Sequence, residues 1–225
     1  MIKMVVFDMA GTTVDEDNVV YKTLRKVIND AGYNFTLDQV LESGAGKEKL
    51  QAIKDILEIE KRPSDEYFPE KLYAIFDSAL AIAYDTIEVK PQPGAGELFK
   101  LLQQNNISVV LNTGYNRATA MSLLKKLNWK EGGEIDGLVT ATDVSNNRPM
   151  PDMINLAMKM FSIFDAGLVV KVGDSIIDIE EGQNAGCGLS IGITTGAHTL
   201  PQLKTAQPDY IISSPAELPI LNLTV

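Results

Sequence analysis

The stretch Met4-Val5-Val6-Phe7-Asp8-Met9-Ala10-Gly11-Thr12-Thr13 decides the fold of this chain. Its first four residues are apolar and uninterrupted by charge, which is typical of a buried strand in a parallel sheet. Asp8 then lies at the carboxyl end of that strand, the edge at which open α/β sheets bind ligands. Taken alone, an Asp in this position also fits a turn or a capping residue.

The composition is that of a protein with a large core. The chain has 225 residues, of which 45% are hydrophobic,. Its net charge of -10 disfavours nucleic acid and anionic membranes as partners, but a small phosphate can still be held by a metal and local basic residues,. No apolar run approaches the roughly 20 residues that span a bilayer. A single cysteine, Cys187, and a first strand that begins almost at Met1 predict a cytoplasmic location,.

Strands and helices alternate over most of the chain. Further strands are predicted at residues 107–111, 137–140, 168–172, 189–193 and 210–212, with helices such as 94–104 and 117–127 between them,. This order is typical of an α/β fold with a Rossmann-like parallel sheet and helices on both faces.

A helical insertion interrupts the alternation after the first strand. Between residue 14 and about residue 91 no comparable strand is predicted, and apolar residues recur at helical spacing over 19–31, 37–42, 47–57 and 65–83,. Polar residues 15–18 and the segment Pro91-Gln92-Pro93-Gly94 mark the two ends. We therefore expect an α/β core domain of residues 1–14 and 92–225, and a helical cap domain of residues 15–91 that forms a lid over the sheet.

Two loops after predicted strands carry groups that favour an anion. Thr113 and Gly114 precede the helix at 117–127, which places a hydroxyl and backbone N–H groups at a helix N-terminus,. A helix cap is the structural alternative. Arg148 lies beside Pro149, and a guanidinium on so stiff a loop is better placed to hold an anion than to form a surface ion pair.

Acidic residues follow a third predicted strand, at Asp174 and Asp178. If a helix begins near Ser175, these two carboxylates are four residues apart and can face the same side. An acidic helix start explains Asp178 alone. Together with Asp8, the carboxylates repel one another unless a cation lies between them, and oxygen ligands with retained waters favour Mg²⁺.

In their order along the chain, these motifs resemble the four motifs of the haloacid dehalogenase superfamily, with the insertion in the place of its first cap. The phosphonoacetaldehyde hydrolases, or phosphonatases, are the branch that the chain resembles most closely. The resemblance spans essentially the whole chain and is carried by Asp-Met-Ala-Gly-Thr-Thr-Val-Asp at 8–15, Thr-Gly-Tyr at 113–115, Asn-Arg-Pro at 147–149, Pro151, and Lys-Val-Gly-Asp at 171–174.

Ala10 distinguishes this chain from the phosphatases of that superfamily. The phosphatases resemble one another in having a second Asp two residues after the nucleophile, which protonates the leaving oxygen and later activates water. Alanine cannot transfer a proton. A C–P bond, whose leaving group is a carbanion, gains nothing from protonation of an oxygen at that point, so Ala10 favours the phosphonatase branch.

Lys47 is the residue at which the resemblance implies covalent chemistry. Phosphonatases form a Schiff base between the substrate aldehyde and a cap lysine in a Gly-x-x-Lys motif, which corresponds here to Gly44 through Lys47. An iminium would act as an electron sink for the departing carbon. A purely electrostatic role of Lys47 is equally open, and Lys49 and Lys54 are alternatives nearby. The chain has Ser43 and Leu50 where the phosphonatases have Met and His.

The resemblance also implies roles for the other residues. Asp8 is expected to attack phosphorus and form an aspartyl phosphate, with Thr113 and Arg148 assisting. The expected Mg²⁺ ligands are Asp8, the Ala10 carbonyl and Asp174, while Asp178 orders the metal's waters or Arg148. The expected substrate-binding residues are Met9, Thr12, Gly114 and Tyr115.

These inferences predict a Mg²⁺-dependent hydrolase of a small phosphonate. A phosphatase acting on a small phosphorylated metabolite and a ligand-binding relative without turnover are the alternatives, and a dehalogenase is a weaker third because it needs no metal cluster. A homodimer through the cap is left open. His198, the only histidine, is expected on a surface loop, although it could reach the rim of the site,.

Overall fold

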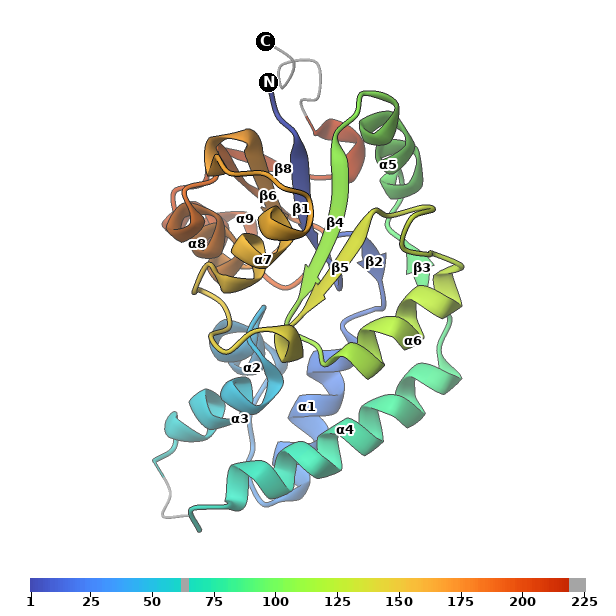
Figure 1. The fold of residues 1–225 in the computed structure, drawn as a ribbon. Helices are drawn as coiled ribbons and strands as arrows, with labels where there is room; N and C mark the ends of the chain where they lie inside the picture. The colour runs from blue at the N-terminus through green and yellow to red at the C-terminus, as the bar shows by residue number, and fades with distance from the viewer. Residues whose placement is uncertain (62–64, 219–225) are drawn as a thin grey trace.

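The computed structural model of the protein describes residues 1–61 and 65–218 (Figure 1). Six strands form one sheet in the order β5-β4-β1-β6-β7-β8, and every neighbouring pair is parallel. The strands are β1 Met4–Asp8, β4 Ser108–Thr113, β5 Gly137–Thr140, β6 Val169–Gly173, β7 Leu189–Ile193 and β8 Tyr210–Ile212. The predicted parallel α/β sheet is confirmed.

The central strand β1 places Asp8 between two neighbours. Its five residues are all buried, as a strand covered on both faces requires,. Asp8 lies in register with Asn112 of β4, and on the other side Phe7 lies in register with Val172 of β6. The chain passes from β1 to β4 and β5 on one side and then crosses to β6 on the other side of β1. The carboxyl ends of β1, β4 and β6 therefore border the crevice where such sheets bind ligands.

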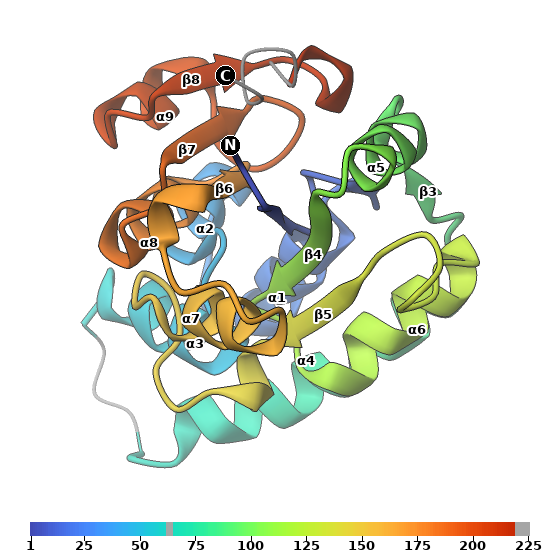
Figure 2. The ribbon, with the colours of Figure 1, turned by 45° about the horizontal axis from the view of Figure 1, so that its top comes forward.

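Helices cover both faces of the sheet, as predicted. They are α5 Ala95–Gln104, α6 Arg117–Leu127, α7 Asp152–Met160, α8 Ile176–Ala185 and α9 Leu200–Thr205, with short 3₁₀ turns η1 Ala141–Asp143, η2 Ala166–Leu168 and η3 Pro215–Glu217. Figure 2 shows α5 and α6 on one side of the sheet and α7 and α8 on the other. Alternate residues of β1 serve the two faces, because Val5 and Phe7 belong to one apolar cluster and Met4 and Val6 to another,.

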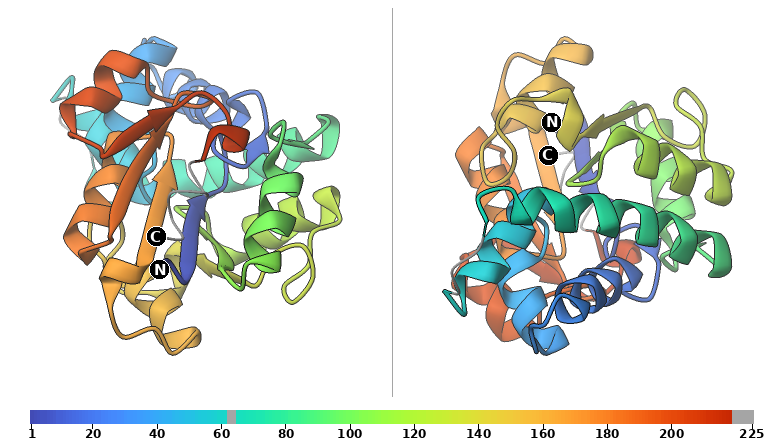
Figure 3. Two further views of the ribbon diagram at one scale, coloured as in Figure 1. Left: turned by 90° about the horizontal axis from the view of Figure 1, so that it is seen from above. Right: turned by 90° about the horizontal axis from the view of Figure 1, so that it is seen from below.

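Between β1 and α5, the described residues form four helices, which we call the helical segment: α1 Val19–Asp30, α2 Leu37–Gly44, α3 Lys49–Glu58 and α4 Phe68–Thr86. Its interior is apolar, with Leu24, Ile53, Phe76 and Leu80 nearly fully buried. The helical segment lies across the carboxyl edge of the sheet, as Figure 1 and the view from below in Figure 3 show. Among the described residues, no helix has the combination of length and apolar character needed to cross a membrane.

A short antiparallel ladder joins the two ends of the helical segment. In it β2 Val14–Asp15 pairs with β3 Lys90–Pro91. The sequence analysis predicted polar and proline-rich punctuation at these points and no strands, because two-residue strands are too short to show an alternating pattern. The ladder holds the entering and leaving chains side by side.

Candidate active site

The carboxyl edge of the sheet brings Asp8 into direct contact with Arg148. Asp8 ends β1 and is only 5% exposed. Arg148, on the loop before α7, donates a hydrogen bond from Nη1 to Asp8 Oδ1 at 2.8 Å and another to the carbonyl of Gly46 at 3.3 Å. The guanidinium therefore orients the carboxylate and also touches the helical segment.

Arg148 is fixed by further bonds on its other side. Its Nη2 donates to the carbonyl and to Oδ1 of Asn112, at 2.8 and 2.6 Å, and its Nε donates to Glu181 Oε2 at 3.0 Å. A planar guanidinium held at all three nitrogens cannot turn away from Asp8.

A buried lysine completes this polar layer. Lys171 has no exposed side-chain surface, and its Nζ lies 2.6 Å from Asn112 Oδ1, 2.9 Å from Asp178 Oδ1 and 3.2 Å from Glu181 Oε2. The sequence analysis assigned no role to Asn112, Lys171 or Glu181. One signal was available, because a lysine inside an otherwise apolar strand needs a buried acidic partner.

Asp174 follows β6 and faces the loop after β1. Its Oδ2 accepts a hydrogen bond from the backbone N–H of Ala197 at 2.6 Å. A Cβ atom on Gly11 would lie 2.3 Å from this oxygen, and a Cβ on Gly196 would lie 1.8 Å from it. Glycine at these two positions thus lets both loops close around Asp174.

Asp8, Asp174 and Asp178 form a buried acidic cluster. Each offers one oxygen atom, and these atoms all lie within 4.8 Å of one another. Burial, and after it repulsion from Asp8 and Asp178, raises the pKa of Asp174 well above its ordinary value. Burial raises the pKa of Asp8 as well, although Arg148 opposes the shift.

Asp178 differs from the other two carboxylates. Burial would raise its pKa, but the charges of Arg148 and Lys171 outweigh burial and hold the pKa below its ordinary value. Ser175 Oγ also donates to Asp178 Oδ2 at 2.5 Å. Asp8 and Asp174 are thus the two carboxylates of the cluster whose pKa burial raises, and a hard divalent ion fits their oxygen donors,.

The loop that follows β1 is held by its own backbone. The Thr13 hydroxyl donates to the Asp8 carbonyl at 2.9 Å, and the Met9 carbonyl accepts backbone bonds from Thr12, Thr13 and Val14. The Met9 side chain is buried in the larger apolar cluster, so its backbone is the part of this residue that suits a polar ligand. Within the described residues, the buried hydroxyl of Thr12 finds no hydrogen-bond partner, which suits a group that binds a ligand,.

The loop after β4 links the sheet to the helical segment. Thr113 is buried, and its Oγ1 accepts a hydrogen bond from the Tyr115 backbone N–H at 3.2 Å. The Tyr115 hydroxyl lies 2.7 Å from the hydroxyl of Tyr84 in α4. The Tyr84 hydroxyl donates a hydrogen bond to Glu16 Oε2 at 3.1 Å. A buried chain of three polar side chains therefore joins the strand end, the helical segment and its entrance.

The helical segment is closed onto the acidic cluster. A Cβ on Gly114 would lie 2.5 Å from the carbonyl oxygen of Lys47, and a Cβ on Gly46 would lie 2.2 Å from Ser175 Oγ. Gly46 also has a φ of +72°, which favours glycine,. Backbone contact this close leaves Asp8 sealed from solvent in this conformation.

The ammonium of Lys47 does not reach the acidic cluster. It forms an ion pair with Asp55 of α3, and the Lys47 side chain is 26% exposed. Lys49, the first residue of α3, points inward instead. It is 6% exposed, and its Nζ lies over the rings of Tyr21 and Tyr115, with 5.6 and 5.3 Å to the ring centroids.

His198 lies in the interior, so the expectation of a surface loop was wrong. Its Nδ1 accepts a hydrogen bond from the Ile176 backbone N–H at 3.0 Å, and its Nε2 lies 3.3 Å from the Leu41 carbonyl. Burial lowers the pKa of His198. The ring thus connects the start of α8 to α2, a contact between distant segments that leaves no trace in the local sequence.

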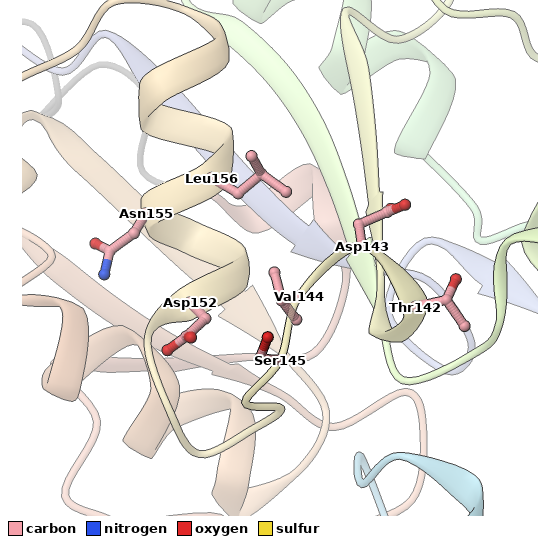
Figure 4. Close-up of a pocket in the computed structure, with 7 residues that line it drawn as sticks. All are labelled: Thr142, Asp143, Val144, Ser145, Asp152, Asn155 and Leu156. Carbon is pink, nitrogen blue, oxygen red and sulfur yellow. The ribbon is translucent and has the colours of Figure 1, made fainter.

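An open groove of about 510 Å³ lies away from these residues, between η1 and α7. Figure 4 shows its lining, which includes Asp143, Ser145 and Asp152. None of the residues around Asp8 lines this groove. The polar residues around Asp8 thus lie under the helical segment, apart from this groove.

Comparison with known proteins agrees with this geometry. The model of the haloacid dehalogenase-like hydrolases matches residues 5–191, and the chain belongs to that family. It is an enzyme of the hydrolase class, with relatives among the phosphonoacetaldehyde hydrolases.

Two of these relatives cover nearly the whole chain. The phosphonoacetaldehyde hydrolase of Latilactobacillus sakei is 29% identical over 254 residues, covering 98% of this chain and 94% of its own length. That of Parabacteroides distasonis is 31% identical over 228 residues, covering 96% of this chain and 83% of its own. A phosphonoacetaldehyde hydrolase-like protein from Oleispira antarctica superposes with a TM-score of 0.84 at 24% identity, covering 99% of this chain and 91% of its own, and shows the shared fold.

Proposed function

We propose that this hydrolase cleaves a small phosphonate of the phosphonoacetaldehyde type with Asp8 as the nucleophile. The observation that carries the proposal is the pairing of Asp8 with Arg148 at 2.8 Å beside Asp174, in a chain that has Ala10 in place of a second acid. The relatives named phosphonoacetaldehyde hydrolase support the substrate class.

The groups around Asp8 suit attack on phosphorus. Arg148 orients the carboxylate and can hold a phosphonyl oxygen,. Thr113, the Thr12 hydroxyl and backbone N–H groups near Met9 and Gly114 supply further polar contacts, and Tyr115 walls the pocket. Attack of an Asp8 oxygen breaks the C–P bond and leaves an aspartyl phosphate, which water hydrolyses.

A Mg²⁺ ion fits the donor set of this site. Asp8, Asp174 and the Ala10 carbonyl are its proposed ligands, and Asp178 is proposed to order bound water or Arg148,. When bound, Mg²⁺ would neutralise charge on the phosphonyl oxygens.

The helical segment serves as the cap in this proposal. Residues 15–91 form the cap domain, residues 1–14 and 92–225 form the core domain, and the β2–β3 ladder lies at their junction. Because Asp8 is buried in the closed form, the cap must open to admit substrate,. We place the protein in the cytoplasm, in keeping with its single free cysteine,.

A homodimer through the cap is part of the same proposal. Ile75 and Ile82 are seven residues apart on α4, which puts them on one side of the helix, and both are largely exposed,. A second copy of the chain would cover this apolar face.

The test is phosphate release from phosphonoacetaldehyde and from a panel of small phosphate esters, with Mg²⁺ and with EDTA. We expect the wild type to release phosphate from the phosphonate only when Mg²⁺ is present. The Asp8→Asn variant should lose at least about 10³-fold in kcat, as expected when a nucleophile is removed. Turnover of esters alone would favour the phosphatase alternative, and full turnover by Asp8→Asn would refute the nucleophile assignment.

A Schiff base at Lys47 stays a prediction. Its ammonium would first have to leave Asp55. Borohydride reduction in the presence of phosphonoacetaldehyde tests it, because an iminium on Lys47 would be fixed as a mass adduct on the peptide that carries this residue.

A further inference from the structure

Lys49 is a buried cation without an acidic partner. Within residues 1–61 and 65–218 no carboxylate lies at ion-pair distance from its Nζ. One hydrogen bond is made, to the Lys47 carbonyl at 2.6 Å. An ammonium carries three donors, and a buried lysine normally has a partner of opposite charge. The position of Lys49 is therefore costly for folding alone and needs a functional reason.

The surroundings of Lys49 direct it toward the site. The Tyr115 ring beneath its Nζ belongs to the loop of Thr113 and Gly114. The Tyr21 hydroxyl on the other side accepts a hydrogen bond from the Gly46 backbone N–H, and the Gly46 carbonyl in turn contacts Arg148. Two aromatic rings and one carbonyl thus hold the ammonium at the closed junction of cap and core.

The charges that act on Lys49 are those of the site. Burial lowers the pKa of Lys49 to about 8, and the charge of Arg148 acts in the same direction. The negative charges of Asp8, Glu48 and Asp174 oppose this shift. The charge of Lys49 in turn acts to lower the pKa of Glu16, against the effect of burial. An amine in this range is protonated at neutral pH and still releases its proton readily, which suits a general acid.

We propose that Lys49 is a catalytic residue of this hydrolase and that its ammonium gives a proton to the carbonyl oxygen of the leaving group. A phosphonate has no bridging oxygen for a second acid beside Asp8 to protonate, so the proton is needed at a different atom from the one that the phosphatase acid serves. The inference rests on the proposed attack of Asp8 on phosphorus. It differs from the Schiff-base prediction both in the residue and in the chemistry, since no bond forms between the lysine and the substrate.

The proton balance closes over one turnover. As Asp8 attacks phosphorus, the C–P bond breaks and its electron pair forms a C=C bond, while the substrate carbonyl oxygen takes the Lys49 proton and an enol leaves. In a phosphate ester the bridging oxygen would take that proton. Water then attacks the phosphorus of the aspartyl phosphate, the P–O bond to Asp8 breaks, and neutral Lys49 accepts the water's proton. Phosphate is released, and the Asp8 carboxylate and the Lys49 ammonium are restored.

The kinetic test compares lysine variants in the full-length enzyme with Mg²⁺, between pH 6 and 9. Lys49→Met should lower kcat by about 10²–10⁴-fold, as expected for loss of proton transfer. Lys49→Arg should stay at least about 10²-fold low, because a guanidinium keeps the charge but gives up no proton. Lys54→Met, on the exposed side of α3 where Lys54 pairs with Glu70, should keep wild-type kcat. Circular dichroism and thermal unfolding check that each variant folds.

The kinetic outcomes separate this inference from the proposed function. If Asp8→Asn keeps its turnover, the proposed function fails whatever the lysines do. If Asp8→Asn is inactive but Lys49→Met keeps kcat within threefold of wild type, the role of Lys49 fails alone. Loss of activity in Lys47→Met with retention in Lys49→Met, or a borohydride adduct on Lys49, would also overturn it.

A binding measurement tests the inference without turnover. In protein with ¹³Cε-labelled lysine, the signal missing from Lys49→Met reports the Lys49 pKa directly. Inorganic phosphate with Mg²⁺ should raise this pKa by at least about one unit, because an anion next to the ammonium favours the charged form. The Lys54 signal, assigned with Lys54→Met, should not move. A Lys49 pKa that phosphate leaves unchanged would place the amine out of reach of the substrate.

Discussion

At the residue scale, Glu16 shows what burial does to a single carboxyl group. It is 3% exposed, and burial raises its pKa to about 7 in spite of hydrogen bonds from the Val20 backbone and the Tyr84 hydroxyl. A raised pKa means that the folded protein binds the proton more tightly than the unfolded chain. The stability that this tighter proton binding by Glu16 adds is therefore complete at low pH and is lost as the pH rises toward 7.

This linkage predicts that Glu16→Gln gains stability relative to the wild type as the pH rises,. From pH 5 to pH 8, the free energy of unfolding of the wild type should fall relative to that of Glu16→Gln by about 2–3 kcal/mol, because burial raises the Glu16 pKa from 4.5 to about 7,. Urea denaturation at several pH values measures the difference. Glu58→Gln, at an exposed position of α3, should show no such trend. A flat difference for Glu16→Gln would mean that Glu16 is ionised in the fold.

Some residues of the site follow from the sequence because their positions are local. Asp8 ends a strand, Asp174 directly follows one and Arg148 lies on a loop beyond one, and a parallel sheet collects such positions at one edge,. Asn112 and Glu181 escaped prediction because their task, holding Arg148, depends on the register of β4 and α8 with distant segments.

At the element scale, two residues at the start of α3 decide which lysine faces the site. The sequence predicted a helix from residue 47, but α3 begins at Lys49, and Glu48 caps it by accepting hydrogen bonds from the backbone of Leu50 and Gln51. Lys47 thus lies in the preceding loop, and its side chain turns to Asp55. Helix ends are set by capping and tertiary contact, which hydrophobic periodicity does not encode.

The contact between this loop and the strand end predicts the effect of Gly114→Ala. The added methyl would meet the Lys47 carbonyl at 2.5 Å, while the φ of Gly114 lies outside the range that strains other residues. The variant should therefore fold normally, with a change in unfolding free energy below about 1 kcal/mol, but close poorly. We expect kcat/KM to fall at least about tenfold, since misplacing the groups at the site by a fraction of an ångström is costly.

Hydrogen exchange supplies the structural readout for Gly114→Ala. Amides of residues 44–47 should exchange faster than in the wild type, because these residues seal the junction. Gly96→Ala is the matched control, since a Cβ at that position of α5 meets nothing within 4 Å. Unchanged exchange in Gly114→Ala together with full activity would show that the contact does not govern closure.

At the scale of the whole molecule, a small part of the acidic excess of the chain lies buried where it can act. The net charge is -10, and four of the carboxylates lie buried at the crevice, on Asp8, Asp174, Asp178 and Glu181. Arg148 and Lys171 offset two of these charges. The remaining excess opposes folding in the absence of a cation, so the site that supports catalysis is also a site of stored repulsion.

That repulsion makes metal binding a measurable part of stability. Mg²⁺ should raise the free energy of unfolding, by about 2.7 kcal/mol at a concentration one hundred times its dissociation constant. Relative to the wild type, Asp174→Asn should be more stable with EDTA and less stable with Mg²⁺. With EDTA it should unfold at a higher temperature than the wild type, because one repelling carboxylate is gone, and with Mg²⁺ it should gain nothing, because a ligand is gone too,.

Thermal unfolding with EDTA and with a series of Mg²⁺ concentrations checks both signs. Asp85→Asn, at an exposed position of α4, removes the same charge far from the crevice and should respond to Mg²⁺ as the wild type does. A Mg²⁺ response that survives in Asp174→Asn would place the metal elsewhere. If Asp174→Asn is less stable than the wild type in EDTA, the hydrogen bond from the Ala197 backbone to Asp174 stabilises the fold by more than the repulsion between the carboxylates destabilises it,.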